Sequence, residues 1–193
     1  MTGGEKESLS GAFGRSILAI FVLSGLFLPT CRTTLTIKPT EHSQVIEFLK
    51  EHRLSTQNLF FPHPEERSTF TTLPHLRLVD EKGNLYFEKT GYSPDAANEM
   101  LKAAQRREVL GQIAFPRLVT IDGQDVSVKD LPKAEFYILE DWATWCSPCP
   151  ELMKQLEEML AQQPPGRFIA IKICQDLFEN DRRFPSKKSP QVY

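Results

Sequence analysis

The chain has 193 residues, of which 40% are hydrophobic and 25% charged, with a formal net charge of −2. This length and composition suffice to bury one core of ordinary size, which disfavours two full-sized domains. Lysine and arginine are scattered along the chain instead of forming a basic stripe, so we expect no nucleic-acid partner.

Residues 1–31 have the pattern of an export segment. The apolar run 16–28 spans roughly 13 residues, whereas a membrane-crossing helix needs about 20, so a signal peptide is favoured over a transmembrane span. Leu28-Pro29-Thr30-Cys31 resembles a bacterial lipoprotein box, whose cysteine receives lipid. A plain signal peptide and a short uncleaved anchor are the alternatives. We expect an exported protein, periplasmic in a bacterium, held on the extracytoplasmic side of a membrane by lipid on Cys31 or by the apolar run.

The first half of the mature chain predicts alternating strands and helices. Its β-prone runs are 35–37, 58–61, 73–79 and 84–87. A helix is expected over 41–52, where apolar residues recur at helical spacing. The last two runs flank a turn at 80–83 and predict a hairpin. A second helix is expected to begin at Ser93, a good N-cap, followed by Pro94.

The second half predicts a hairpin, a buried strand, a helix and another buried strand. The hairpin turns at Asp122-Gly123. Phe136-Tyr137-Ile138-Leu139 is a continuous apolar run, typical of a strand buried on both faces of a sheet with parallel pairs. A helix follows Cys149, and 168–174 is the second buried strand. We therefore expect one α/β domain over 32–181, with a mixed central sheet flanked by helices, and a polar tail over 182–193.

Cys146-Ser147-Pro148-Cys149 lies where the first buried strand meets the helix. At a helix start the first sulfur lies beside unpaired backbone N–H groups and the positive end of the helix dipole, which favours a thiolate at Cys146. This thiolate is able to attack a substrate disulfide, after which Cys149 attacks back to release the reduced substrate. Pro148 lacks an N–H and stiffens the helix start. The motif predicts disulfide exchange with protein thiols and disulfides.

The segment Trp142-Ala143-Thr144-Trp145-Cys146-Ser147-Pro148-Cys149 resembles the active-site segment of thioredoxins. Its Trp-Ala-Thr-Trp-Cys spelling is closest to the extracytoplasmic TlpA-type oxidoreductases. The resemblance implies a thioredoxin-like fold, with Cys146 as nucleophile, Cys149 as resolving thiol and Trp145 on the substrate-facing surface. It implies a redox partner protein and no cofactor. We expect Trp142 to be a core aromatic.

The resemblance runs in an unusual order. Residues 72–83 resemble the stretch that follows the redox helix in the family and carries a cis-proline facing the cysteines, here Pro74. In this chain the stretch precedes the motif, so 32–110 resembles the family's C-terminal half and 115–181 its N-terminal half. The fold is then circularly permuted, or the chain holds a half-domain followed by a truncated domain. We predict that the Leu73-Pro74 bond is cis and that Pro74 packs against the cysteine pair.

Two acidic residues precede the motif. Glu140 aligns with the buried acid that assists proton transfer in thioredoxins, and the alternative is a carboxylate at a strand end that reaches water. Asp141 stands where the family usually has an aromatic residue. Either the strand end is more exposed here, or a charge lies near the redox pair.

Two other functions compete with disulfide exchange. A Cys-x-x-Cys pair is also able to bind zinc or copper, and a third alternative is a redox-inactive binding module that kept the motif. A closed zinc site needs four ligands, and the histidines lie far from the motif along the sequence, so we expect no metal. These histidines are His42, His52, His63 and His75. Cys174 lies in an apolar run and is expected to be a small buried residue in a strand.

Overall fold

The computed structural model describes residues 41–66 and 72–176, which all belong to one compact unit. Its α-helices are α1 (His42–Glu51), α2 (Ala96–Arg106) and α3 (Cys149–Ala161). Its strands are β1 (Leu59–Pro62), β2 (His75–Val79), β3 (Asn84–Thr90), β4 (Gly111–Gln112), β5 (Leu118–Val119), β6 (Asp125–Val126), β7 (Phe136–Trp142) and β8 (Phe168–Cys174). A single 3₁₀ turn, η1 (Val128–Asp130), precedes β7. The expected strand at 35–37, the export segment and the polar tail lie outside the described residues.

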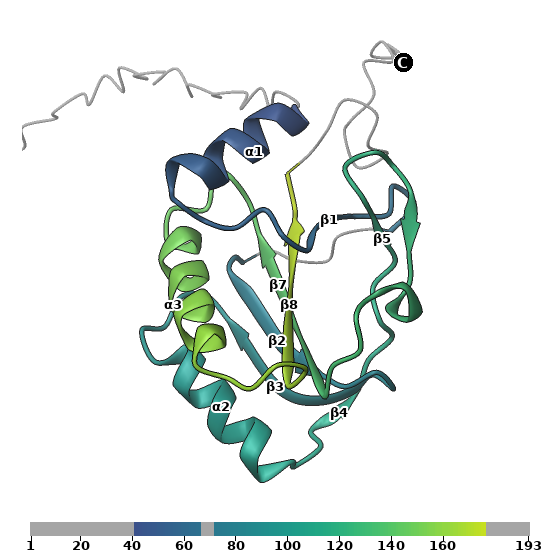
Figure 1. The fold of residues 1–193 in the computed structure, drawn as a ribbon, viewed down its shortest axis with the longest axis vertical. Helices are drawn as coiled ribbons and strands as arrows, with labels where there is room; N and C mark the ends of the chain where they lie inside the picture. The colour runs from purple at the N-terminus through teal and green to yellow at the C-terminus, as the bar shows by residue number, and fades with distance from the viewer. Residues whose placement is uncertain (1–40, 67–71, 177–193) are drawn as a thin grey trace, which may run out of the picture. The chain divides into compact units, whose positions relative to one another are not determined.

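The strands form one mixed sheet in the order β4-β3-β2-β7-β8-β1-β5-β6, which confirms the α/β prediction (Figure 1). β8 runs parallel to both of its neighbours, β7 and β1. β2 runs antiparallel to both of its neighbours, β3 and β7. The two halves of the sequence meet at two places: β2 pairs with β7, where His75 lies opposite Asp141, and β1 pairs with β8 and β5. They therefore share one sheet.

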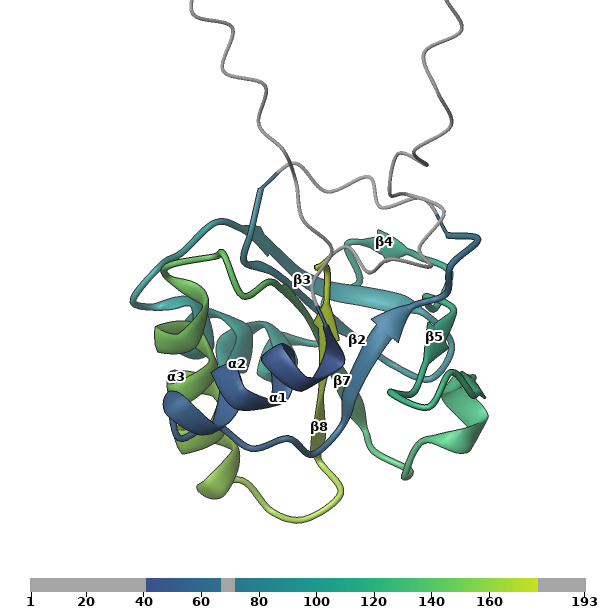
Figure 2. The same cartoon turned by 90° about the horizontal axis from the view of Figure 1, so that it is seen from above.

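The three α-helices of the described residues lie on one face of this sheet (Figure 2). Alternate residues of β7 pack in different clusters, because successive side chains of a strand point to opposite faces. Phe136 and Ile138 pack with residues of α2 and α3, whereas Tyr137 and Leu139 pack with apolar residues from the stretch 113–134. All seven residues of β7 are buried, as a strand covered on both faces requires. A sheet flanked by helices was expected, but hairpin and loop residues cover its second face.

One local prediction was wrong. The second helix begins at Ala96 with Asp95 at its N-cap, because Ser93 instead closes the preceding turn by accepting a hydrogen bond at its carbonyl from the Ala96 N–H. The strand predicted at 58–61 is β1, which extends one residue further and ends at Pro62. At that end β1 pairs only with β5, since β8 pairs with Leu59 and Phe60, and a proline is tolerated where one side of a strand has no partner.

Candidate redox site

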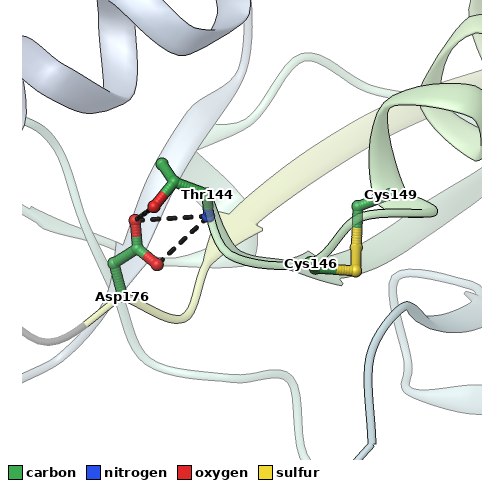
Figure 3. The surroundings of a disulfide bond; sticks show 4 residues. All are labelled: Thr144, Cys146, Cys149 and Asp176. Atoms are coloured by element: carbon green, nitrogen blue, oxygen red, sulfur yellow. Dashed lines mark hydrogen bonds between the residues drawn. A yellow bond between two sulfur atoms is a disulfide. The ribbon is translucent and has the colours of Figure 1, made fainter. Parts of the chain in front are cut away.

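Cys146 and Cys149 are joined by a disulfide between the end of β7 and the start of α3, with their Cα atoms 5.5 Å apart (Figure 3). The Cys149 N–H donates a hydrogen bond to the Cys146 carbonyl oxygen, 3.1 Å away, so a tight turn leads into the helix. Helix α3 begins at Cys149, where a helix was expected after the motif, and Pro148 is its N-cap residue. Cys146 is 4% exposed and Cys149 is fully buried, so the first cysteine is the one closer to solvent.

The two tryptophans of the motif have opposite environments. Trp145 is 69% exposed, which is unusual for so large an apolar side chain and leaves its ring available to a partner. Trp142 is fully buried and stacks on Phe48 of α1, with ring centroids 5.7 Å apart, so its prediction as a core aromatic is confirmed. Cys174 is also buried in a strand, as predicted, and packs in the same hydrophobic cluster as the cysteine pair.

Asp176, which follows β8, fixes the stretch that leads into Cys146 (Figure 3). Its buried carboxylate accepts hydrogen bonds from the Thr144 N–H at 3.1 Å and from the Thr144 hydroxyl at 2.7 Å. Burial raises the pKa of Asp176, and the hydrogen bonds from Thr144 oppose that change. The adjacent Gln175 donates its backbone N–H to the Trp142 carbonyl oxygen at 2.7 Å. Sequence reasoning missed this pair, although a Gln-Asp dipeptide directly after an apolar strand was a usable signal.

Pro74 lies at the start of β2, beside the end of β7. The Leu73-Pro74 bond is cis, as predicted, and Pro74 is buried. Leu73 packs against the cluster that contains Cys146 and Cys149, so this stretch of the first half does reach the cysteine pair. Contact between the Pro74 ring and a sulfur stays a prediction.

Glu140 is fully buried, so the interpretation that its carboxylate reaches water is wrong. Within the described residues neither of its carboxylate oxygens has a hydrogen-bond partner. Burial raises the pKa of Glu140 to about 8, because a charge is costly where water is excluded, and the nearby Lys172 ammonium lowers it only in part. This carboxyl group is therefore mostly protonated at neutral pH.

Asp141 is buried as well, which rules out the more exposed strand end and leaves a charged group next to the motif. Arg77 donates to one carboxylate oxygen at 2.7 Å, and Gln175 donates to the other at 2.6 Å. His75, whose Nδ1 lies 3.5 Å from Asp141, reaches Glu88 with its Nε2 at 2.8 Å. These residues form a polar cluster on the face of the sheet away from the helices.

Residues 41–66 and 72–176 contain no group of three or more His, Cys, Asp or Glu side chains placed to hold a metal ion. The same residues contain no helix that is both long and apolar enough to cross a membrane. Cys31 and the apolar run lie outside the described residues.

Comparisons with protein-family models, with curated proteins and with solved structures found no match to this chain.

Proposed function

We propose that this chain is a thiol-disulfide oxidoreductase with a thioredoxin-like fold in circularly permuted order. The observation that carries the proposal is the bonded Cys146–Cys149 pair at a strand-to-helix junction, preceded by the exposed Trp145. The sheet supports the permuted order, because β7, α3 and β8 of the second half lie beside β2, β3 and α2 of the first. The resemblance of residues 142–149 to thioredoxins supports the same function.

The chemistry is a two-step exchange. In the reduced protein the Cys146 thiolate attacks one sulfur of a substrate disulfide, so that a mixed disulfide forms and the other substrate sulfur leaves as a thiolate. Cys149 then attacks Cys146, which closes the internal disulfide and expels the second substrate thiolate. Two electrons pass to the substrate, together with two protons, and the reverse sequence oxidises a dithiol. A redox partner protein restores the starting state.

The other site residues have supporting roles in this proposal. Trp145 contacts the substrate, Pro148 stiffens the turn before Cys149, and Pro74 completes the surface beside the pair. Glu140, which is buried under α3, is protonated and donates its proton to a departing thiolate. Cys31 lipid or the apolar run 16–28 holds the protein at the extracytoplasmic side of a membrane.

The test is redox equilibrium with glutathione, combined with trapping of the mixed disulfide. We expect the reduced chain to exchange with glutathione disulfide, and a Cys149→Ser variant to accumulate a mixed disulfide on Cys146. A Cys146→Ser variant is the matched control, and it should trap far less. An equilibrium potential near about −270 mV indicates a reductase, and one near about −120 mV an oxidant.

Stoichiometric oxidation without turnover on a protein disulfide would instead support a redox-inactive binding module. Tight binding of copper or zinc by the reduced pair, with no exchange, would support a metal-handling function. Either result would contradict the proposal.

A further inference from the structure

Lys172 of β8 is a buried lysine whose ammonium is fixed by two oxygens. Its side chain is 4% exposed, and its Nζ donates to the Glu157 carboxylate and to the Ser55 carbonyl oxygen, each 2.6 Å away. The same Glu157 oxygen accepts a hydrogen bond from the Ser55 N–H at 2.9 Å. Helix α3, strand β8 and the loop after α1 therefore meet at this ammonium.

Glu140 is the register partner of Lys172 in the parallel pairing of β7 with β8. Register partners point to the same face of a sheet, so the two side chains share the face covered by the helices. Even so, both carboxylate oxygens of Glu140 lack a hydrogen-bond partner among the described residues. A buried lysine thus lies beside a buried acid, and its hydrogen bonds go to a different acid.

Solvent exposure explains which acid holds the ammonium. Glu157 is 30% exposed, so its charged form keeps part of its hydration, whereas Glu140 is fully buried. Ionising a fully buried carboxyl costs far more than ionising one at the surface. Glu157 also follows Cys149 and Met153 at intervals of four residues along α3, which places it on the stripe that faces β7 and β8.

We infer that Glu157 is a positioning residue that, with the Ser55 carbonyl, holds the Lys172 ammonium away from Glu140 and so keeps Glu140 protonated. The charged groups that act on Glu140 are Lys172 from β8, Glu157 from α3 and Asp141 from its own strand. Asp141 points to the opposite face, and β2 contributes the apolar Leu76 opposite Glu140. The pKa of Glu140, raised to about 8, agrees with this arrangement.

The consequence for catalysis rests on the proposed function. When the internal disulfide is reduced, an incoming thiolate bonds to Cys146 and Cys149 leaves as a thiolate that needs a proton. A protonated Glu140 supplies it and is then reprotonated from water. Releasing Lys172 to pair with Glu140 would remove that proton at neutral pH.

The test is an NMR titration of the Glu140 carboxyl carbon, assigned by the loss of its signal in a Glu140→Gln variant. In Glu157→Gln the ammonium is free to pair with Glu140, and we expect the titration midpoint to fall by about 1 to 3 pH units. Glu158→Gln removes the same charge from an exposed position on α3 and should leave the midpoint unchanged. An unchanged midpoint in Glu157→Gln would overturn the inference.

Loss of the Glu157 charge also lowers the Glu140 titration midpoint directly, because one repelling negative charge is removed. Measurements in a Lys172→Met variant separate this direct effect from the effect of the released ammonium. In Lys172→Met we expect a midpoint above that of the wild type, and adding Glu157→Gln to it should produce only a small shift. The double variant leaves no buried lysine without a partner, so it also serves if Glu157→Gln alone fails to fold. A shift of equal size in both backgrounds would contradict positioning through Lys172.

The pH profile of exchange with glutathione links the inference to function. We expect the midpoint of the rate profile to move with the Glu140 midpoint in Glu157→Gln and to stay in place in Glu158→Gln. Absence of exchange in the wild type would refute the proposed function, while the NMR titration would still decide the role of Glu157.

Discussion

Glu140 places a titratable carboxyl group in the core, and this makes the stability of the protein depend on pH. Its pKa is about 8 in the folded chain against 4.5 for an unperturbed glutamate, so between these values the folded state binds the extra proton. Stability therefore falls as pH rises through this range. We expect wild type to lose on the order of a few kcal/mol more than Glu140→Gln between pH 5 and about 8.5. Urea unfolding at both pH values measures this difference, and parallel losses in the two proteins would contradict it.

Thr144 tests the hydrogen bonds that Asp176 makes to the stretch before Cys146. Thr144→Val removes the hydroxyl at 2.7 Å but keeps the shape of the side chain and the backbone N–H. A bond to a charged acceptor contributes about 1.5 to 3 kcal/mol, so we expect a loss of this size in the free energy of unfolding. Thr144→Ser retains the hydroxyl and should recover most of the loss. If valine and serine cost the same, the hydroxyl bond is not what stabilises this stretch.

At the scale of elements, Gly83 in the turn between β2 and β3 is the position where a side chain is least tolerable. Its φ is +81°, and a Cβ there would lie 2.2 Å from the Ile113 carbonyl oxygen. Gly91 has the same φ with nothing within 4 Å, so it is a matched control. We expect Gly91→Ala to cost about 1 to 2 kcal/mol through backbone conformation alone. Gly83→Ala should cost about 1 to 3 kcal/mol more through the forced shift, and equal losses in thermal unfolding would refute the close approach.

Elements with a strong sequence pattern were predictable. The continuous apolar runs gave β7 and β8 because strands buried on both faces need no polar alternation, and the apolar stripe after Cys149 gave α3. The predicted N-cap of α2 was wrong because two nearby residues, Ser93 and Asp95, both satisfy the N-cap preference. The sequence therefore predicted which helices and strands exist better than it predicted where they begin and end.

The surroundings of the site were less predictable than its cysteines. The motif itself indicated Cys146 and Cys149, and the resemblance of residues 72–83 to a stretch that carries a cis-proline in thioredoxins indicated the cis bond at Pro74. Glu140 is buried because α3 and β8 pack around it, and the residues next to it in the sequence do not reveal this packing. The bond from Thr144 to Asp176 likewise joins residues 32 positions apart. Such contacts follow from packing after the chain has folded.

At the scale of the whole molecule, the shared sheet predicts that neither half folds alone. β2 and β7 make five register pairs from His75↔Asp141 to Val79↔Tyr137, and separation would leave both strands with an open edge. We expect separate chains of residues 32–110 and 111–193 to lack cooperative unfolding, and a mixture of the two to regain it. Circular dichroism during urea titration makes the measurement. A half that unfolds cooperatively alone would favour the half-domain interpretation over the permuted fold.

The order of the strands along the chain has a consequence during synthesis. β2 and β3 leave the ribosome before β7, and at about 5 to 20 residues per second β7, the strand that will pair with β2, follows seconds later. Through that interval the hairpin presents an open edge, which is a template for any other extended strand. In a crowded polysome the nearest such strand is β7 of a neighbouring nascent copy, and pairing with it satisfies the same register. Exchange of halves between copies is therefore the misassembly to which this chain order is most exposed.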